Sequence, residues 1–460
     1  MQIQSFINNS YYAGESKFIK LNPFTRQSLH EVSSCDLIGL VTAIRSANLA
    51  FQDFKSSGIS DRRAIIEKIR DLIEEKKIEY AVLEATDQGL PLFFVKQNLI
   101  ESVLTNITEV LSQTPIENGI QYSGVGVVAL ITSWNLSLRV ILDRLIPALL
   151  AGNAVIIKVS SQSPITAHIL SELIAASEAP KSLIQVIVTD DIEVKKTLVS
   201  HPGVRAISLT ASLETTALVL PLVTNSSFQN FKKIQISSGS KNSAVALTEP
   251  TDAVFNAVMN SFMLGQGQLV WNSARLFILE KYEKLWEERI TEYLQGLRPS
   301  ESILDSSAWS PCLKPESFGK FEEIKKQVFE DQGKLIQSSF VLTESQKKTH
   351  LPALFTKDMS RCSTLQQDQV RTPVFILSAV KYPFDVAKYS NVSYFGFAAH
   401  LWGEVEKLAK VAENLDVGLV SYNKSSVEVS GAVTAVKQSG FGLQDFQSFG
   451  AFFSNVKKIT

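Results

Sequence analysis

Short apolar segments alternate with helical patterns through the middle of this 460-residue chain. Each segment is a near-continuous apolar run, as in a strand that is buried on both faces of a parallel sheet. Between the runs, apolar residues recur at steps of three and four, which indicates helices. This alternation predicts an α/β fold with a doubly wound parallel sheet. The predicted strands are residues 125–131, 154–158, 184–188 and 206–209, and the predicted helices are 138–150, 163–177 and 192–200.

Two further regions flank this pattern. Residues 37–111 show helical spacing, which predicts three amphipathic helices. A second alternation of strands and helices begins near Ile234 and ends at about Tyr422, broken by a polar stretch at 344–369. Because a single hydrophobic core stops growing at roughly 250–300 residues, a chain of this length is expected to form two or more domains.

Charge and composition exclude several classes of protein. The 45 Lys and Arg residues nearly balance 46 Asp and Glu residues, whereas a nucleic-acid binder is typically basic. The N-terminus has no basic segment followed by an apolar one, and no apolar run is long enough to span a bilayer. Three cysteines in so long a chain indicate a reducing compartment, and the five histidines show no metal-ligand spacing. We therefore expect a cytoplasmic protein without a metal site, and neither nucleic acid nor membrane among its partners.

Several motifs occur together in an order that resembles the aldehyde dehydrogenase superfamily. One motif alone would be weak, but the ordered set covers nearly the whole chain. The matching segments are Trp134-Asn135 after the first strand, the run at 147–158, the turn at 208–212, the Gly-Gln-Gly-Gln at 265–268 and the Lys-Gln-Ser-Gly-Phe-Gly at 437–442.

The resemblance implies an aldehyde dehydrogenase-like fold of two Rossmann-like α/β domains, plus an oligomerisation hairpin and a C-terminal strand. Residues 1–110 and 125–234 would form the nucleotide-binding domain, and residues 235–423 the catalytic-type domain. Residues 111–124 and 424–460 would be the oligomerisation elements. The C-terminal strand at 452–459 resembles the family strand that pairs with a partner subunit, so a homodimer or tetramer is expected.

The catalytic positions implied by the resemblance are changed. The family places its catalytic cysteine two residues after the second Gln of the Gly-Gln-Gly-Gln motif, and here that position is Val270. A valine side chain cannot form a covalent bond to a carbonyl carbon. The general-base glutamate lies four residues before a lysine that matches Lys241, so its position is Ser237, whose hydroxyl has no usable basicity. Asn135 matches the asparagine that stabilises the oxyanion, although a structural turn asparagine is the alternative reading.

The expected cofactor-binding positions are only partly kept. Trp134 and Lys158 match the family, and Ser212 is retained in the phosphate-binding turn. Ser161 and Gln369 stand where glutamates typically contact the two riboses, so charge-assisted contacts are lost. The resemblance therefore implies NAD or NADP as a possible cofactor, with binding weakened or absent.

Two more changes bear on the cofactor. Ala211 and Thr216 replace glycines of the phosphate turn, and glycine is what permits close approach of the backbone to a pyrophosphate. Arg371 stands where the family has a phenylalanine beside the nicotinamide. Arg371 is thus either a cation in the cofactor site or a surface arginine on a loop that has drifted.

These changes lead to two functional hypotheses. The first is a catalytically impaired homologue, a pseudoenzyme with a scaffold or regulatory role, which could pair with an active homologue. The second is an active NAD(P)-dependent aldehyde oxidoreductase with non-standard chemistry, since direct hydride transfer needs a polarising donor and a bound cofactor but no covalent step.

Overall fold

The apolar runs in the middle of the chain form the parallel core of an eight-stranded sheet. A computed structural model describes residues 1–112, 120–224, 231–307, 309–313, 315–424, 435–442 and 451–458. The strand order in this sheet is β21-β11-β10-β7-β8-β9-β2-β3, with β7 to β11 all parallel. Its strands are β2 Ser5–Ile7, β3 Ser10–Tyr12, β7 Val127–Ile131, β8 Ala154–Val159, β9 Ile184–Val188, β10 Ala206–Thr210, β11 Lys233–Ser237 and β21 Gly440–Phe441. The four strands predicted for this region are confirmed.

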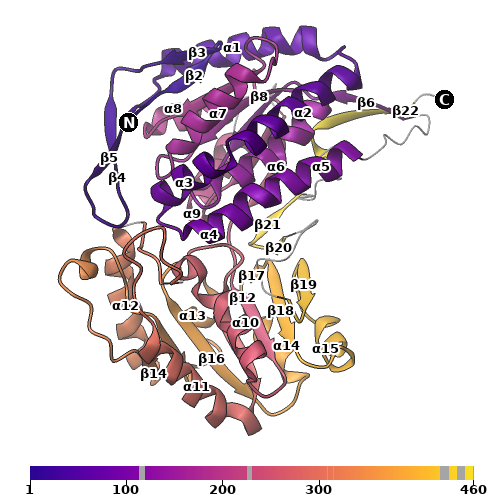
Figure 1. Cartoon of the computed structure of the whole chain (residues 1–460). Coiled ribbons are helices and arrows are strands. Elements are labelled where there is room, and N and C mark those ends of the chain that lie inside the picture. The colour runs from indigo at the N-terminus through magenta and orange to yellow at the C-terminus, as the bar shows by residue number, and fades with distance from the viewer. Residues whose placement is uncertain are drawn as a thin grey trace.

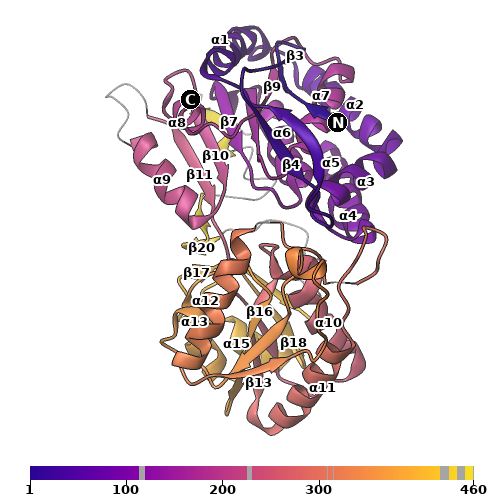
Figure 2. The same ribbon diagram turned by 90° about the vertical axis from the view of Figure 1, so that its left-hand side faces the viewer.

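Helices pack against this sheet in layers, as Figures 1 and 2 show for the indigo-to-magenta part of the chain. Helix α1 packs on β7 and β8, whereas α6 and α7 pack on β8 and β9 and are covered in turn by α2, α3 and α5. The helices are α1 Leu37–Phe54, α2 Ile59–Glu75, α3 Lys77–Gln88, α4 Leu92–Val95, the π-helical turn η1 Lys96–Glu101, α5 Ser102–Ser112, α6 Ser137–Leu150, α7 Ile165–Ala176, α8 Ile192–Ser200 and α9 Leu213–Thr224. None of the helices in the described ranges is both long and apolar enough to cross a bilayer.

The expectation of three helices in residues 37–111 is wrong, because the chain restarts a helix after Gly89. Gly89 ends α3 in the left-handed conformation, with φ of 69°, and Pro91 then precedes α4. Glycine adopts this conformation without strain, and proline is well placed at a helix start. The apolar spacing continues through this break, so it did not reveal where one helix ends and the next begins.

A second, seven-stranded sheet forms the other lobe, with the order β14-β15-β16-β13-β12-β18-β19. Its strands are β12 Asn242–Ala246, β13 Ser273–Leu279, β14 Lys334–Gln337, β15 Leu354–Lys357, β16 Val374–Val380, β18 Ala398–Trp402 and β19 Leu419–Tyr422. Its helices are α10 Asp252–Met263, α11 Glu283–Gly296, α12 Glu316–Glu330, α13 Thr364–Gln367, α14 Asp385–Ser390 and α15 Val405–Ala412, with short 3-10 turns η2 Leu264–Gly267, η3 Glu280–Tyr282 and η4 Gln346–Lys348.

The second alternation begins at β12, and not near Ile234 as the sequence suggested. Residues 233–237 form β11, which pairs in parallel with β10 and so completes the first sheet. The polar stretch at 344–369 contains β15 and α13, which bury its apolar residues Leu354, Phe355 and Leu365. The predicted domain boundaries stay a prediction, and one of them falls inside β11.

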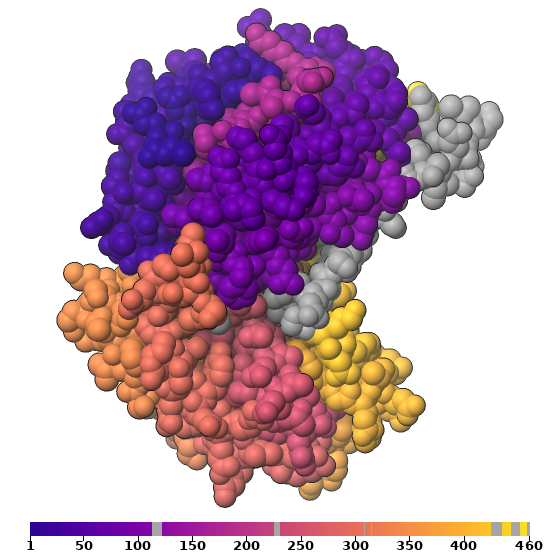
Figure 3. All heavy atoms as spheres, in the orientation of Figure 1, coloured from indigo at the N-terminus to yellow at the C-terminus, as the bar shows by residue number. Residues whose placement is uncertain are grey.

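The two lobes contact each other at several points. Arg26, in the turn between β4 (Lys17–Leu21) and β5 (Ser28–Ser33), donates hydrogen bonds to the carbonyl oxygens of Cys312 and Leu313 in the other lobe, at 2.6 and 3.3 Å. Strand β5 also pairs with β1, Gln2–Ile3. The space-filling view shows the indigo and purple residues packed directly on the orange lobe (Figure 3).

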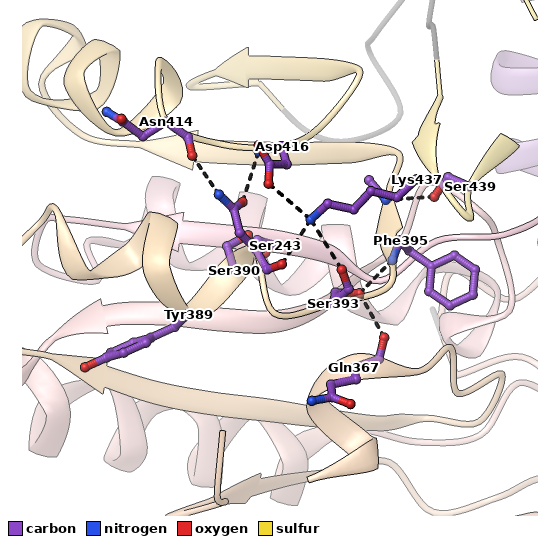
Figure 4. A network of polar contacts seen from close by, with 12 residues as sticks. Ser243, Gln367, Tyr389, Ser390, Ser393, Phe395, Asn414, Asp416, Lys437 and Ser439 are labelled. Atoms are coloured by element: carbon purple, nitrogen blue, oxygen red, sulfur yellow. Dashed lines mark hydrogen bonds and ion pairs between the residues drawn. The ribbon is translucent and has the colours of Figure 1, made fainter. Parts of the chain in front are cut away.

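Residues 435–442 cross from one lobe to the other. Strand β20 (Val436–Lys437) pairs with β17 (Phe395–Gly396) in the second lobe, and β21 pairs with β11 in the first. Lys437 fixes this crossing, because its Nζ contacts the carboxylate of Asp416 at 3.4 Å and donates to the carbonyl oxygens of Asn391 and Ser393 (Figure 4). Ser439 Oγ accepts a hydrogen bond from the backbone N–H of Gly396, at 3.0 Å.

The C-terminal strand pairs within the chain. Strand β22 (Ser454–Lys458) runs antiparallel to β6 (Ile120–Gly124). The oligomerisation role of the segments 111–124 and 424–460 stays a prediction, and much of both segments lies outside the described residues. Buried Asn153 ties this ribbon to the first lobe, since its Nδ2 donates to the carbonyl oxygens of Phe453 and Ala148 and its Oδ1 accepts from the N–H groups of Val125 and Gly126.

The turn that follows β7 is held by a buried glutamine. Leu136 has a positive φ of 47°, which is unusual for a residue with a side chain. Its N–H donates to Gln88 Oε1 at 2.8 Å, and Gln88 Nε2 donates in turn to the carboxyl group of Glu84. The other oxygen of Glu84 accepts from Thr166 Oγ1 at 2.6 Å. Gln88 therefore fixes the backbone immediately after Asn135.

Replacing Gln88 by leucine should destabilise the protein. Gln88→Leu would leave the Leu136 N–H and one Glu84 oxygen buried without a partner, and each unsatisfied group costs about 1–3 kcal/mol. We expect the free energy of unfolding, measured by urea denaturation, to fall by at least about 1 kcal/mol. Gln52→Leu on the exposed face of α1 is the control. Equal effects of the two substitutions would show that the Gln88 hydrogen bonds do not hold the turn.

Asn153→Ala should have a larger effect. The substitution removes four hydrogen bonds to backbone groups of three segments. We expect a loss of about 3 kcal/mol or more in the free energy of unfolding, because several buried backbone groups lose their partners together. Asn414→Ala, at an exposed asparagine, serves as the reference substitution. A loss below about 1 kcal/mol would mean that water replaces these partners.

Candidate active site

A cavity of about 450 Å³ lies at the carboxyl ends of β7, β8, β10 and β11. Open parallel α/β sheets bind their ligands at this edge. Its lining includes the eight residues expected at the catalytic and cofactor-binding positions, although they come from segments far apart in the chain. These are Trp134, Asn135, Lys158, Ser161, Ser212, Ser237, Val270 and Gln369.

Asn135 is positioned to donate into the cavity. Its side-chain Oδ1 accepts a hydrogen bond from Ser133 Oγ at 2.7 Å. This contact uses the acceptor end of the amide and leaves the NH₂ end for a ligand. Asn135 is 9% exposed and is followed by the Leu136 backbone that Gln88 holds. The arrangement can polarise a carbonyl oxygen.

Val270 lies on a loop that is fixed by hydrogen bonds of its own. The Val270 carbonyl oxygen accepts from Ser240 Oγ at 2.6 Å and from Asn242 Nδ2 at 2.9 Å. Three successive residues just before it, Gly265 to Gly267, have positive φ values between 56° and 70°. Glycine favours this conformation, which accounts for two of the three positions. The Val270 side chain packs against the cluster of Phe397, Ala398 and Ala435 and adds an apolar surface to the cavity wall.

Ser237 is the last residue of β11. It pairs with Thr210 of β10 on one side and with Gly440 of β21 on the other. Asp143 of α6 is the only carboxylate among the described residues that line the cavity. Asp143 Oδ1 accepts from Asn106 Nδ2 at 2.9 Å, and Oδ2 lies 3.7 Å from Arg139 Nε. The oxygens of Asp143 are thus already engaged by two neighbours.

None of the three cysteines is among the described residues that line the cavity. Cys312 is fully buried, and its thiol donates to Gln266 Oε1 at 3.0 Å. Burial raises the pKa of Cys312 to about 12 and that of Cys35 to about 12, so neither forms the nucleophilic thiolate near neutral pH. Cys362 is exposed.

Two lysines and a helix N-terminus form the end of the cavity where a nucleotide is expected. Desolvation, together with the positive charge of Lys195, lowers the pKa of Lys158 to about 7. Ser212 Oγ accepts from the N–H of Thr215 at 3.2 Å and so caps the start of α9. Backbone N–H groups at a helix start can bind phosphate oxygens, so these residues fit a nucleotide phosphate.

Gln369 and Arg371 lie together beside Gly239. Gln369 Oε1 accepts from Arg371 Nη2 at 3.2 Å and from Nε at 3.4 Å. Gly239 has a φ of 148°, and a Cβ there would lie 2.4 Å from Gln369 Oε1. The reading of Arg371 as a surface residue is wrong, because it is partly buried and lines the cavity. Burial lowers the pKa of Arg371.

Sequence reasoning missed Arg139, Asp143, Arg144 and Lys195, which also line the cavity. A signal for three of them was present. The segment that becomes α6 is apolar apart from these charges, and buried charges in an apolar helix often serve a site. Residues four apart on a helix can also form a solvent-exposed ion pair, so the spacing of Arg139 and Asp143 alone does not indicate a site.

Comparison with known proteins gives a consistent result. The family model described as "Aldehyde dehydrogenase family" matches residues 11–459. The 2-aminomuconic semialdehyde dehydrogenase of Mus musculus is 25% identical over 487 residues, covering 100% of this chain and 98% of the relative. The retinaldehyde dehydrogenase 3 of Homo sapiens is 24% identical, covering 99% and 92%.

Solved structures share the fold. The aldehyde dehydrogenase KauB from Pseudomonas aeruginosa superimposes with a TM-score of 0.90 at 22% identity, over 100% of this chain and 97% of that one. An indole-3-acetaldehyde dehydrogenase in complex with NAD⁺ has a TM-score of 0.90 at 21% identity, over 99% and 96%. The fold class inferred from the sequence is thereby confirmed, and the chain belongs to the aldehyde dehydrogenase family.

Proposed function

We propose that this family member is a pseudoenzyme that has lost the covalent chemistry of aldehyde oxidation. The observation that carries the proposal is Val270, an apolar side chain in the cavity wall at the position expected for the nucleophile. Without a nucleophile no thiohemiacetal forms, so there is no covalent intermediate from which hydride can leave. A scaffold or regulatory role, alone or with an active homologue, is then the function that remains.

Other groups in the cavity do not supply the missing chemistry. The buried Cys312 thiol is bonded to Gln266 and lies outside the cavity lining. The Ser237 hydroxyl is not a base near neutral pH. Asp143 is engaged by Asn106 and Arg139, and it belongs to α6, not to the β11 end where the base is expected.

The wild-type protein should not form NADH or NADPH from aldehydes. Loss of the nucleophile in other covalent enzymes lowers kcat on the order of 10⁶-fold. We expect no detectable absorbance change at 340 nm (about the nicotinamide maximum) with short aliphatic, aromatic or amino-aldehydes. Turnover within about tenfold of the usual range of kcat would refute the proposal.

Restoring both groups should restore activity. In Val270→Cys with Ser237→Glu, supplied with NAD⁺ as the hydride acceptor, the cysteine can attack the aldehyde, loss of hydride to NAD⁺ gives the thioester, and the glutamate can activate water to hydrolyse it. Val270→Cys alone should acylate but release product slowly, and Ser237→Glu alone should stay inactive. An inactive double variant that still binds NAD would mean that the site has changed at more positions than these two.

A second candidate is direct hydride exchange between a nicotinamide cofactor and an aldehyde. It is favoured by the orientation of Asn135, whose NH₂ group is left free to polarise a carbonyl oxygen. Bound NADH or NADPH would supply the hydride. Reduction of an aldehyde by the wild type, lost in Asn135→Ala, would support this candidate over the first.

Nucleotide binding is expected to be weakened or absent, and residual binding should depend on pH. Because the pKa of Lys158 is lowered to about 7, the lysine loses its charge as the pH rises through that value. An anionic nucleotide binds the charged form, so the dissociation constant of NADP should increase between about pH 6 and about pH 8.5. Calorimetric titration of Lys158→Met should show a much smaller pH dependence. Equal slopes for the two proteins would exclude Lys158 from the site.

The chain is further proposed to form a homo-oligomer through its C-terminal strand. Strand β22 pairs with β6 along one edge, and a two-stranded ribbon leaves backbone groups at its other edges for a partner. Deleting residues 451–460 should convert the oligomer to a monomer in light scattering. A truncated protein that stays oligomeric would locate the interface elsewhere.

A further inference from the structure

Positive charge dominates the walls of the cavity. Asp143 is the only carboxylate in the described lining, against five cationic side chains. Lys158, Lys195 and Arg371 belong to the end where a nucleotide is expected. The other two cations are Arg139 and Arg144 of α6, the helix that follows Asn135. A nucleotide does not account for charge at this second end.

Arg139 is a largely buried cation in the cavity lining. Its side chain is only 13% exposed, and its Nη1 donates to the carbonyl oxygen of Asn98 at 2.9 Å. Its Nε is buried and faces Asp143 Oδ2 at 3.7 Å, so a ligand in the cavity would contact the guanidinium through its Nη atoms. A carboxylate is the acceptor that matches a guanidinium best.

The charge of Arg139 lies close to the position of the lost nucleophile. The Cζ atom of Arg139 is 5.4 Å from the centre of the Trp271 ring, and Trp271 directly follows Val270. A ligand group held by Arg139 would therefore belong to a molecule that occupies the substrate end of the cavity.

Asp143 moderates this charge without neutralising it through a hydrogen bond. The 3.7 Å separation between Asp143 Oδ2 and Arg139 Nε is an ion-pair distance beyond hydrogen-bond range. The Asn106 amide holds the other carboxylate oxygen at 2.9 Å. Asp143 consequently reduces the attraction of this end of the cavity for an incoming anion.

The walls beside these two charges are apolar. Val140, Trp271, Phe397 and Leu419 all line the cavity. Val270, Trp271 and Leu419 also pack against the buried cluster of Phe397, Ala398 and Ala435, so these side chains belong to one apolar group. Such a surface suits a short hydrocarbon chain, since burying apolar area is favourable.

We propose that the cavity binds small carboxylate-bearing aldehydes, with the carboxylate on Arg139 and the hydrocarbon chain on the apolar wall. This proposal names the ligand class of the same cavity, and it rests on the proposed function, which takes the cavity as the substrate site. It requires binding alone, so it holds with or without turnover.

The test compares two probes that differ only in the carboxylate, 4-oxobutanoate and butanal. Calorimetry on the full-length protein should show that 4-oxobutanoate binds about tenfold more tightly, as expected for a charge-assisted contact. Arg139→Gln should abolish the difference. Asp143→Asn should do the opposite and tighten 4-oxobutanoate by about threefold, because it removes a like charge, while butanal binding stays the same.

Controls separate this site from general electrostatics. Arg289→Gln, on α11 and outside the cavity, changes the net charge equally and should leave both dissociation constants unchanged. Lys195→Gln removes a cation from the end of the cavity where a nucleotide is expected, and so tests whether the selectivity arises there. Equal binding of the two probes by the wild type would overturn the proposal, and so would selectivity that is lost in Lys195→Gln but kept in Arg139→Gln.

Two further measurements distinguish carboxylate binding from phosphate binding, and ligand binding from turnover. Glyceraldehyde 3-phosphate and glyceraldehyde form a second matched pair, and discrimination in this pair alone would show that the site takes phosphate and not carboxylate. NADH formation from 4-oxobutanoate would refute the pseudoenzyme and leave the ligand class standing. Asp143→Asn is expected to bind 4-oxobutanoate more tightly, and an unfolded variant could not give that result.

Discussion

The parallel pairing of β7, β8, β10 and β11 is the constraint on which the site depends. Apart from the buried, mutually hydrogen-bonded Ser208 and Gln235, the interiors of these strands are apolar, and polar residues stand at their carboxyl ends. Parallel direction brings those ends to one edge of the sheet. Asn135, Lys158, Ser212 and Ser237 reach the same cavity for this reason, although about 100 residues separate the first from the last.

Hydrogen bonds to backbone groups fix the shape of the Val270 loop, whatever side chain stands at position 270. Ser240 and Asn242 bind the Val270 carbonyl oxygen, and Asn272 donates to the carbonyl oxygens of Ser261, Phe262 and Leu264. None of these contacts involves the side chain at position 270. The backbone of this loop can therefore keep its shape whatever side chain stands at position 270, and the fold gives no sign by itself of whether a reaction occurs.

Most of the fold was accessible from the sequence because its signals are local. The strands of the first sheet are short apolar runs, and ordered motifs placed eight scattered residues in one cavity. The pairing of β11 with β10 was not accessible, since strand neighbours are set by contacts between distant segments. The positions of Arg139 and Asp143 in the cavity wall could not be predicted from the sequence for a related reason. Their spacing of four residues has the same appearance on an exposed helix and on one that lines a cavity.

The crossing segment at 435–442 has a mechanical consequence. One of its ends belongs to a backbone ladder with β17 and the other to a ladder with β11, and only a few residues separate them. A relative motion of the lobes would therefore have to be absorbed by Gln438 and Ser439, the two residues between the ladders, or break one ladder. Ser439 lines the cavity, so any such motion would alter the cavity wall directly.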